Sequence, residues 1–417
     1  MEFKKYNLGD LGEICMCKRI MKAETTECGD VPFYKIGTFG GTPDVYISKE
    51  LFEEYKKKYS YPKKGDVLIS AAGTIGRAVI YNGEDAYYQD SNIVWIDNDE
   101  TKVLNSYLFY LYKNIRWKIS TGSTILRLYN DNIRETEVIV PDLQSQANIS
   151  KVLSLIDSKI NFNIRINAEL EAMAKQLYDY WFVQFDFPDE NGKPYKSSGG
   201  KMVYNETLKR EIPEGWEVKT LADLLGDDVS GDWGQDEEKG NYKLKVNCIR
   251  GADLKDPLNA PLRYISSKNT NRILKQGNII VEISGGSPVQ ATGRSLYVTK
   301  GLLERYNGSL ICSNFCRALV LKDIIMSHYF YYTWNLFYDN GIMFNFEGKT
   351  SGIKNLLLDM FVENSWYFPP QNLCKKYATI IENINNKIDS NKINNLELIS
   401  LRDSLLPMLM NGQVIVE

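Results

Sequence analysis

Two short stretches of the sequence place glycines, hydroxyl side chains and an arginine directly after an apolar run. The first covers residues 70–77 (Ser-Ala-Ala-Gly-Thr-Ile-Gly-Arg), and the second covers residues 284–288 (Ser-Gly-Gly-Ser-Pro) and is followed by Arg294. Glycine lets a backbone come close to a flat or charged partner, while hydroxyl and guanidinium groups suit phosphate oxygens and base edges. One such stretch is equally well explained as a solvated turn. The recurrence of the pattern favours a binding surface for nucleic acid.

Further basic and polar residues recur at corresponding places in the two halves of the chain. Arg127 follows Thr-Gly-Ser at 121–123, and Lys354 follows Thr-Ser-Gly at 350–352. A group of lysines, at positions 56–58, 63 and 64, precedes the first loop. The residues expected to contact DNA are Lys63, Lys64, Thr74, Arg77, Ser91, Asn92, Ser123 and Arg127 in the first half, and Ser284, Ser287, Arg294, Ser313, Asn314, Ser351, Lys354 and Asn355 in the second half.

Candidates for metal or nucleophilic chemistry are few. His328 is the single histidine of the chain, which excludes a multi-histidine metal site and most histidine-dependent catalytic triads. Cys15 with Cys17, and Cys312 with Cys316, lack the paired spacing of a zinc site. We therefore expect no bound metal, and we interpret His328 as a structural residue.

Three patterns resemble enzyme motifs, and each lacks a required part. Residues 348–350 (Gly-Lys-Thr) match the end of a phosphate-binding loop, but Met343 stands where that loop needs glycine. Asp157 and Lys159 give the Asp-x-Lys of some nucleases, but inside an expected helix rather than at a strand edge. The Pro-Pro pair at 369–370 has the wrong neighbours for the catalytic tetrapeptide of a DNA adenine methyltransferase. The sequence thus predicts no catalytic residue and no cofactor bound by the chain itself.

The elements that must position the binding residues include two long helices with one shared pattern, predicted at about 144–182 and 371–409. From residue 153, apolar or asparagine side chains recur at alternating steps of three and four, and the series recurs 228 positions later. The predicted coiled-coil seam consists of Leu153, Ile156, Ile160, Asn163, Asn167, Leu170 and Leu177 in the first helix, and Ile381, Ile384, Ile388, Asn391, Asn395, Leu398 and Leu405 in the second. Ala174 and Arg402 occupy the remaining matched step.

Asparagine in an apolar seam costs stability unless its amide finds a hydrogen-bonding partner, so it penalises wrong registers. The asparagines stand at equivalent steps of both helices, which allows them to meet across an antiparallel pairing. The alternative, that one or both pairs face solvent or a partner protein, stays open from the sequence.

The repeat extends beyond the helices and sets the predicted domain organisation. Pro141 matches Pro369 at the same offset of 228, residues 64–69 resemble 276–281, and Ser91-Asn92 resembles Ser313-Asn314. We predict an α+β fold with an internal pseudo-two-fold repeat, in which two recognition domains are separated by two long antiparallel helices. The predicted parts are a first recognition domain at 1–141, a first spacer helix at 142–185, a linker at 186–212, a second recognition domain at 213–369, and a second spacer helix with a tail at 370–417.

The bulk composition limits the choice of protein class. Seven cysteines without regular spacing, and no apolar run long enough to span a membrane, predict a reduced cytoplasmic protein. The formal net charge of −3 argues against a uniformly basic nucleic-acid-binding surface. Any DNA contact must therefore come from local patches or be shared with partner proteins.

The layout resembles the DNA-specificity subunit of type I restriction-modification systems. The resemblance is carried by Pro-Glu-Gly-Trp at 213–216, by Lys-Gly-Asp-Val-Leu at 64–68 before the Gly-Thr-Ile-Gly loop, by the proline-led heptad helices, and by Leu-Leu-Pro-Met-Leu-Met-Asn-Gly at 405–412. It implies two target-recognition domains that each read half of a split, asymmetric DNA target, with the helix pair as the ruler between them. It also implies docking of two methyltransferase subunits and of restriction subunits, which would bind S-adenosylmethionine and ATP in place of this chain.

The sequence also allows two functions other than this non-catalytic DNA-binding role. One is a coiled-coil scaffold without any role on DNA. The other is a stand-alone nuclease or methyltransferase, which would show cleavage or methylation by the purified chain.

Overall fold

A computed structural model describes residues 2–117, 126–285, 289–350 and 353–416. The chain divides into two compact units. Unit 1 comprises Met1–Asn161 and Leu396–Glu417, and unit 2 comprises Phe162–Asn395. Both unit boundaries fall inside the two long helices, so each unit contains half of each helix together with one β-rich part.

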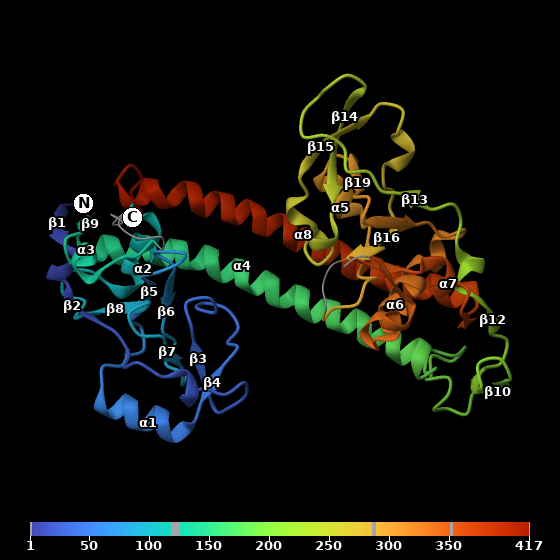
Figure 1. Ribbon diagram of the computed structural model, residues 1–417, viewed down its shortest axis with the longest axis horizontal. Coiled ribbons are helices and arrows are strands. Elements are labelled where there is room, and N and C mark those ends of the chain that lie inside the picture. The colour runs from blue at the N-terminus through green and yellow to red at the C-terminus, as the bar shows by residue number, and fades with distance from the viewer. Residues whose placement is uncertain (1, 118–125, 286–288, 351–352, 417) are drawn as a thin grey trace. The chain divides into compact units, whose positions relative to one another are not determined.

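Unit 1 is built on a four-stranded sheet of order β2-β8-β5-β6, a three-stranded sheet of order β4-β3-β7, and the pair β1-β9 (Figure 1). Strand β3 runs parallel to β7, and the other named pairs are antiparallel. The strands are β1 (Phe3–Asn7), β2 (Gly12–Cys15), β3 (Val31–Tyr34), β4 (Tyr46–Ile47), β5 (Val67–Ser70), β6 (Ala78–Ile80), β7 (Tyr87–Tyr88), β8 (Ile93–Asn98) and β9 (Glu137–Pro141). The short helices are α1 (Lys49–Lys58), α2 (Asn105–Asn114) and α3 (Asn130–Arg134).

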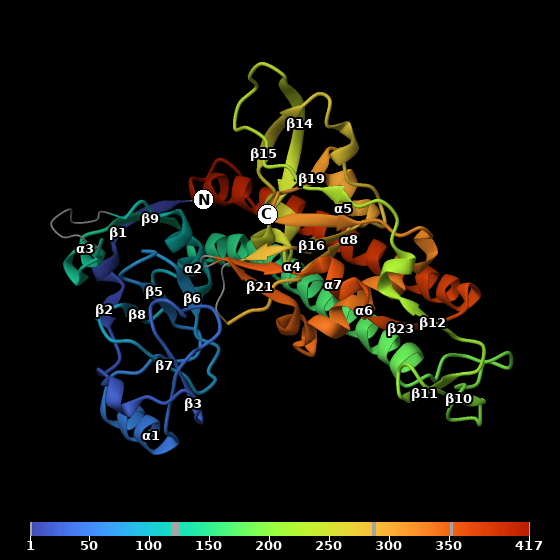
Figure 2. The same ribbon diagram turned by 45° about the vertical axis from the view of Figure 1, so that its right-hand side comes forward.

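Unit 2 repeats this topology strand for strand (Figure 2). Its four-stranded sheet has the order β13-β20-β16-β18, its three-stranded sheet β15-β14-β19 contains the parallel pair β14 and β19, and β12 pairs with β23. These strands are β12 (Glu217–Thr220), β13 (Val229–Ser230), β14 (Tyr242–Ile249), β15 (Leu262–Ser266), β16 (Ile279–Glu282), β18 (Ser295–Tyr297), β19 (Leu310–Cys312), β20 (Cys316–Leu319) and β23 (Ser365–Phe368). Helices α6 (Ser327–Asp339) and α7 (Leu358–Val362) match α2 and α3, whereas α5 (Lys300–Arg305) lies between β18 and β19, where unit 1 has no named helix between β6 and β7. The internal repeat predicted from the sequence is therefore a repeat of the fold.

Unit 2 has an additional sheet of order β17-β22-β21, formed by β17 (Ser284–Gly285), β21 (Glu347–Thr350) and β22 (Ile353–Leu356). Among the described residues of unit 1, the corresponding contact is a bridge between Ala72 and Arg127, and residues 118–125 lie outside the description. Both arrangements extend the C-terminal end of the central strand, β5 or β16, which is where the small-residue loops begin.

The turn before the central strand shows how closely the two units agree. Gly65 and Gly277 both have a positive φ, of 99° and 85°, and the next residue, Asp66 or Asn278, accepts a hydrogen bond from the backbone three positions earlier at 2.7 Å. Glycine adopts this left-handed conformation without steric cost. The predicted match between 64–69 and 276–281 is therefore confirmed, because both segments form one turn that leads into β5 and β16.

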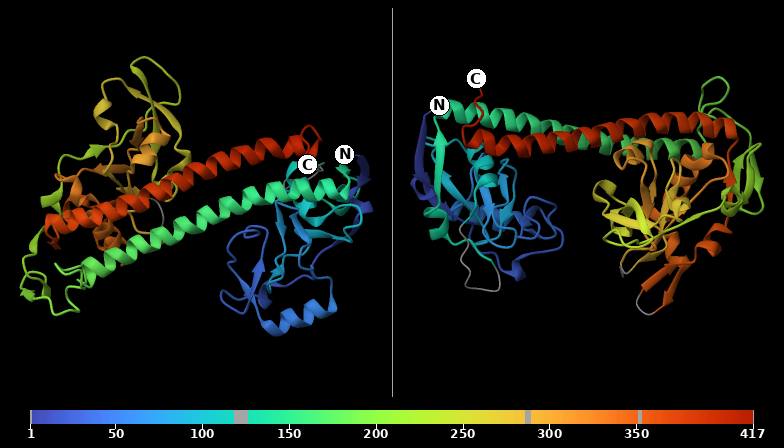
Figure 3. Two further views of the ribbon diagram at one scale, coloured as in Figure 1. Left: turned by 180° about the vertical axis from the view of Figure 1, so that it is seen from behind. Right: turned by 90° about the horizontal axis from the view of Figure 1, so that it is seen from above.

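The two long helices are α4 (Leu143–Tyr178), which continues as a π-helix over Asp179–Val183, and α8 (Gln371–Met410). Figure 3 shows the two ribbons running beside each other in opposite directions within each unit. In unit 2, Asn163 Nδ2 donates to Asn395 Oδ1 and Asn391 Nδ2 donates to Asn167 Oδ1, both at 2.8 Å. The question left open by the sequence is thereby answered for unit 2, since the asparagines pair with each other and the helices are antiparallel.

The seam positions are buried or half-buried along both helices. In unit 1 the helices are joined by a charged contact instead of asparagines, because Arg402 Nη1 donates to Asp157 Oδ1 at 2.8 Å. Asp157, which belongs to the nuclease-like pattern rejected above, therefore serves a contact between helices. The tail extends the pairing, since Asn148 Nδ2 donates to the Val416 carbonyl at 3.5 Å.

Residues 186–212, expected to be a linker, contain a β-hairpin of β10 (Met202–Asn205) and β11 (Arg210–Pro213). The segment is packed onto unit 2, because the Phe187 ring stacks on Trp216 with centroids 5.5 Å apart. Helix α2 ends at Asn114, because Ile115 has the extended backbone angles φ −68° and ψ 133°.

Each unit has its own apolar core. In unit 1 a cluster around Tyr107, Ile149 and Leu153 includes Leu409 near the end of α8. In unit 2 the equivalent cluster is aromatic, with the Phe182 ring 4.9 Å from both Tyr329 and Tyr377. The first turns of α4 and α8 are thus fixed to the β-rich part of their own unit.

Candidate nucleic-acid interface

In unit 1 the loop at 70–77 is a tight turn closed by the last residue of β5. Ser70 Oγ accepts a hydrogen bond from the Arg77 N–H at 2.9 Å and donates to the Thr74 carbonyl, and the Gly76 N–H donates to the Ser70 carbonyl at 2.9 Å. A Cβ at Gly76 would lie 2.4 Å from Trp117 Nε1, so only glycine fits there. The turn places Gly73 and Thr74 at an exposed tip.

The Arg77 side chain is exposed beside this tip. Its Nη1 donates to the Phe39 carbonyl at 2.8 Å, which orients the guanidinium without neutralising its charge. Arginine carries five N–H donors, so one carbonyl contact leaves donors for another acceptor. This arrangement suits a phosphate or a guanine edge.

A second arginine lies next to the same loop. The backbone of Arg127 forms an antiparallel β-bridge with Ala72. Its side-chain Nη2 donates to Ser91 Oγ at 3.0 Å and to Asn92 Oδ1 at 3.1 Å. The structure therefore brings together Ser91, Asn92 and Arg127, three residues that the sequence predicts as DNA contacts. The partners of Arg127 are neutral, so its positive charge is retained.

Lys63 and Lys64 do not join this group. They precede β5, whereas the loop follows it, and a four-residue strand separates its ends by about 10 Å. Lys63 Nζ also pairs with Asp97 Oδ1 at 2.8 Å, while Lys64 is exposed and its stem lies against Gly83. The two lysines thus form a separate basic point on unit 1.

In unit 2 the predicted arginine is neutralised by an acid. Arg294 makes two hydrogen bonds to Glu282, from Nε to Oε2 at 2.8 Å and from Nη2 to Oε1 at 2.6 Å. Glu282 is the last residue of β16, and its side chain is 7% exposed. This hydrogen-bonded ion pair raises the pKa of Arg294 further above its ordinary value. The guanidinium is held as a fixed fork with its charge compensated.

The other predicted residues of unit 2 have mixed surroundings. Ser284 Oγ donates to Asn355 Oδ1 at 2.6 Å, across the β17–β22 pair. Lys354 Nζ pairs with Glu347 Oε2 at 3.0 Å, and Glu347 also accepts from the Thr292 backbone N–H at 2.8 Å. Ser313 is fully buried, whereas its neighbour Asn314 is exposed. Ser123, Ser287 and Ser351 lie outside the described residues.

One correspondence predicted from the sequence is wrong by one residue. In the strand registers Ser70 pairs with Ile93 and Glu282 pairs with Cys316, so Ser91-Asn92 corresponds to Asn314-Phe315 rather than to Ser313-Asn314. The shared Ser-Asn dipeptide suggested the wrong alignment. A one-residue slip reverses the face on which a side chain lies, which is why Ser313 is buried while Ser91 is half-buried.

The acids Glu282 and Glu347 were missed as parts of the site. A signal for Glu282 was available, because the offset of 212 that aligns 64–69 with 276–281 places Glu282 opposite Ser70. The sequence carries no comparable signal for Glu347, since its contact with Lys354 depends on the β21–β22 hairpin.

In the parts of the chain that the structure describes, no three His, Cys, Asp or Glu side chains gather in a way that would hold a metal ion. His328 is buried against the Tyr297 ring, with centroids 4.3 Å apart, which fits a structural role. None of the helices within the described ranges has the length and hydropathy needed to cross a membrane.

Comparison with known proteins supports the resemblance on residues across the whole chain. Residues 1–172 match the family model described as the type I restriction modification DNA specificity domain. A Haemophilus influenzae protein described provisionally as a type I restriction enzyme specificity subunit is 60% identical over 158 residues, which span 38% of this chain and 41% of that protein. The type I restriction enzyme MjaIX specificity subunit of Methanocaldococcus jannaschii is 26% identical over 100% of this chain and 97% of its own length.

The fold itself also matches a solved structure. The type I restriction-modification system S subunit from M. genitalium superimposes with a TM-score of 0.58 at 16% identity, over 98% of this chain and 96% of that chain. Specificity subunits of this kind are in general non-catalytic. Similarity to them implies recognition of a DNA sequence and assembly with other subunits. Residues 1–172 thus match the type I restriction modification DNA specificity domain, and the chain is similar over its whole length to type I restriction enzyme specificity subunits.

Proposed function

We propose that the chain reads a split, asymmetric DNA target, with one half-site recognised by each unit. The observation that carries the proposal is the pair of equivalent surfaces at the ends of β5 and β16, which share a backbone but differ in side chains. Arg127 in unit 1 corresponds to Asn355 in unit 2, because Leu128 and Leu356 donate equivalent backbone bonds to Ala71 and Ile283. Arginine suits guanine and phosphate, whereas asparagine suits adenine. Equivalent surfaces with different donors fit two different half-sites.

The helix pair is the spacer in this proposal. Half-sites read from one face of a duplex are about one helical turn, or ~34 Å, apart. A helix of 36 residues, such as α4, is about 54 Å long and can set a separation of that size. The chain would position two methyltransferase subunits, and restriction subunits with them, on DNA in the cytoplasm. S-adenosylmethionine and ATP would bind to those partners.

Exposed apolar residues on the two helices support docking of partner subunits. On α4, Leu155, Phe162 and Met173 are 56–61% exposed, and on α8 Leu401 is 47% exposed. Apolar side chains grouped on the surface of one element mark an interface more often than scattered ones do. We assign these outer faces of α4 and α8 to the methyltransferase contact.

The proposal is tested by co-expressing the chain with its cognate adenine methyltransferase and mapping methylated adenines across a genome. We expect a two-part motif with a fixed spacer, methylated only when this chain is present. Arg127→Ala should relax or abolish one half-site, and Asn355→Ala the other, because each variant removes a donor from one unit. Lys209→Ala, on the exposed hairpin of unit 2, is the control and should leave the motif unchanged.

Two outcomes would count against the proposal. Loss of both half-sites in either single variant would contradict the assignment of one half-site to each unit. Methylation that is independent of the chain, or no specific binding of DNA by a stable complex, would favour the scaffold function instead.

A second test addresses the spacer. Insertion of seven residues into both α4 and α8 at matched seam positions lengthens each helix by about 10 Å while preserving the heptad register. The spacer of the methylated motif should then grow by about three base pairs, and both half-site sequences should stay the same. A change in a half-site sequence would contradict the role of the helices as a ruler.

A further inference from the structure

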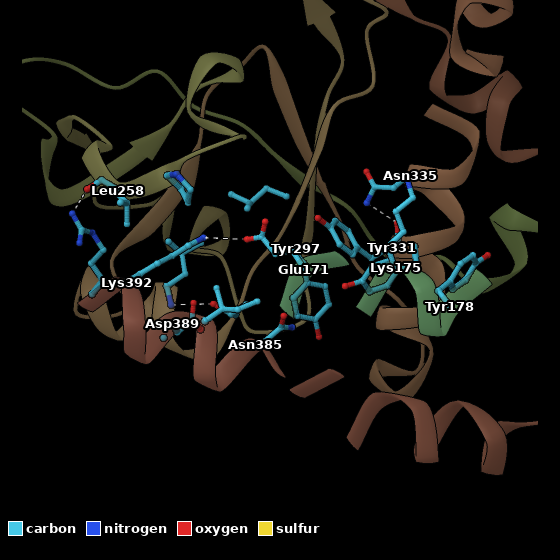
Figure 4. A pocket seen from close by; sticks show the side chains of 18 of the residues that line it. Glu171, Lys175, Tyr178, Leu258, Tyr297, Tyr331, Asn335, Asn385, Asp389 and Lys392 are labelled. Atoms are coloured by element: carbon cyan, nitrogen blue, oxygen red, sulfur yellow. Dashed lines mark hydrogen bonds and ion pairs between the residues drawn. The ribbon is translucent and has the colours of Figure 1, made fainter. Parts of the chain in front are cut away.

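Unit 2 contains a cavity of about 310 Å³ between α4, α6, α8 and the segment from β18 to α5 (Figure 4). It lies at the seam of the helix pair, and its lining does not include the predicted DNA contacts. Three tyrosines, Tyr297, Tyr331 and Tyr332, form one side, and Asn385 and Asp389 of α8 form another. The cavity therefore combines aromatic faces with an amide and a carboxylate.

Two of the acids that line the cavity, Asp179 and Asp389, take part in none of the ion pairs found among the described residues. Lys175 Nζ pairs with Asp339 Oδ2 at 2.6 Å, and Lys392 lies 3.9 Å from Glu171 at the rim. Asp389 takes part in neither pair, and its buried Oδ2 atom lacks a hydrogen bond of good geometry among the described residues. Burial raises the pKa of Asp389 above its usual range. The carboxylate faces the Thr299 hydroxyl, the Gly301 backbone N–H and Lys392, which all lower that pKa but do not outweigh burial. A buried carboxylate oxygen of this kind is stabilised by a cationic donor.

The equivalent place in unit 1 is occupied by a side chain of the chain itself. The first half of α4 in unit 1 matches the first half of α8 in unit 2, so Asp157 corresponds to Asn385, and Arg402 likewise corresponds to Ala174. Arg402 Nη1 donates to Asp157 Oδ1 at 2.8 Å, and the Tyr110 hydroxyl donates to Asp157 Oδ2 at 2.9 Å. Lys113 also contributes a positive charge, because its Nζ atom lies 3.9 Å from Asp157 Oδ2.

The aromatic side of the two places is also equivalent. Helices α2 and α6 share a burial pattern at an offset of 222 residues, which aligns Tyr110 with Tyr332 and Lys113 with Asn335. Unit 2 thus keeps the tyrosine, but it has alanine in place of the arginine and amides in place of the aspartate and the lysine. Its acid, Asp389, stands one helical turn beyond Asn385. Asn385 lines the cavity in unit 2, and its counterpart in unit 1, Asp157, accepts a hydrogen bond from the guanidinium of Arg402.

We propose that this cavity binds a guanidinium group supplied from outside the chain, placed between the tyrosine faces and Asp389. Guanidinium is planar, stacks on aromatic rings and donates in parallel to a carboxylate, which are the two kinds of surface that the cavity offers. An ammonium group would satisfy the carboxylate but would lose the stacking. The inference extends the proposed function, because the expected source is an arginine of a methyltransferase subunit docked on the helix pair.

The first experiment tests the cavity without any partner. L-argininamide is titrated into the full-length chain and followed by saturation-transfer NMR, with L-citrullinamide as the uncharged isostere and L-lysinamide as the ammonium analogue. We expect argininamide to bind at least tenfold more tightly than either analogue. Absence of this preference in the wild-type chain would overturn the proposal and would leave the DNA-recognition proposal untouched, since the methylation motif tests that separately.

Two variants assign the binding to the cavity. Asp389→Asn removes the carboxylate, and the pair Ala174→Arg with Asn385→Asp rebuilds the internal ion pair of unit 1 inside unit 2. Each should weaken argininamide binding at least tenfold. Glu382→Gln removes an exposed acid of α8 outside the cavity and should have no effect. Unchanged binding in Asp389→Asn would overturn the proposal even if the double variant did not fold.

A second experiment identifies the source of the guanidinium. The number of methyltransferase subunits bound per chain is measured by native mass spectrometry, with and without argininamide. If a partner's arginine occupies the cavity, Asp389→Asn should weaken the binding of one of the two methyltransferase subunits. Argininamide should then compete with that subunit for the chain. If argininamide binds while partner stoichiometry does not change, the cavity takes a free guanidinium compound, and the partner source is wrong.

Discussion

Arg77 in unit 1 and Arg294 in unit 2 stand at the same place in one fold and have opposite electrostatic surroundings. The Ser70 N–H donates to the Arg77 carbonyl at 3.0 Å, and the Glu282 N–H donates to the Arg294 carbonyl at 2.8 Å. The residue at the end of the central strand decides the difference. The Ser70 hydroxyl orders the loop and does not compensate the positive charge of Arg77. The Glu282 carboxylate instead accepts two hydrogen bonds from the guanidinium of Arg294 and compensates its charge.

A similar contrast appears on the neighbouring segment, where Lys354 stands one residue before Asn355, the counterpart of Arg127. Arg127 rests on neutral partners in unit 1, while Lys354 in unit 2 is held by Glu347. Unit 1 therefore offers positive charge to a phosphate backbone, and unit 2 offers fixed donors whose charge is compensated within the domain. Two copies of one backbone can thus contribute differently to recognition, because affinity for DNA depends mainly on charge and specificity on oriented donors.

The largest expected effect comes from removing Glu282, the acid that makes the surroundings of Arg294 different from those of Arg77. Glu282→Ala should destabilise unit 2 by about 2–3 kcal/mol, because it leaves a mostly buried guanidinium without its partner. Hydrogen exchange on peptides of unit 2 would measure the loss, with peptides of unit 1 as the internal reference. Glu282→Gln keeps an acceptor oxygen and should cost less. An equal loss in both variants would mean that side-chain volume rather than charge is what matters.

Low pH should destabilise unit 2 relative to unit 1, by an amount similar to that expected for Glu282→Ala. Burial lowers the pKa of His328 to about 4, and in the equivalent position of α2 unit 1 has Ser106. The unfolded chain binds a proton near pH 6.5, which the folded unit 2 refuses until about pH 4, so stability is complete above pH 6.5 and falls as the pH drops. The loss should be about 2 kcal/mol at pH 5.

Exchange rates of unit 2 peptides measured between pH 7 and pH 5, after correction for intrinsic rates, would test this expectation. His328→Phe should remove the pH dependence while keeping a ring against Tyr297. A pH dependence that persists in His328→Phe would assign it to another group.

The arginines themselves should differ in how they affect binding to DNA. Arg77→Ala should weaken binding of the assembled complex at least tenfold and reduce the slope of log K against log salt by about one. Arg294→Ala should leave the slope nearly unchanged, because Glu282 already compensates that charge, and should relax the sequence preference instead. Salt titrations of both variants on one DNA duplex make the comparison. Equal slopes would contradict the contrast between the two sites.

Sequence reasoning reached the framework of this protein more readily than its site chemistry. The long helices and the turns at Gly65 and Gly277 follow from periodicity and glycine placement, which are local signals. The pairing of Lys354 with Glu347 depends on a hairpin register, and the place of Ser313 depends on a one-residue slip that identical dipeptides concealed. Hydrogen bonds between side chains far apart in the sequence leave no periodic pattern, so they could not be read in advance.

The smallest expected effect compares the seams of the two units. Arg402→Ala should cost unit 1 about 1 kcal/mol, because its ion pair with Asp157 is partly exposed and partly screened. The variant should also open in unit 1 the kind of space that unit 2 already has.

Millimolar argininamide should then restore part of the lost stability, measured by exchange of peptides from 143–161. Citrullinamide should restore none of it. Arg402→Ala combined with Asp157→Asn should lose the rescue, because the carboxylate that receives the guanidinium is gone. Rescue that survives in this double variant would mean that stacking on the aromatic side chains is sufficient. A carboxylate, including Asp389 in unit 2, would then not be needed to bind a guanidinium.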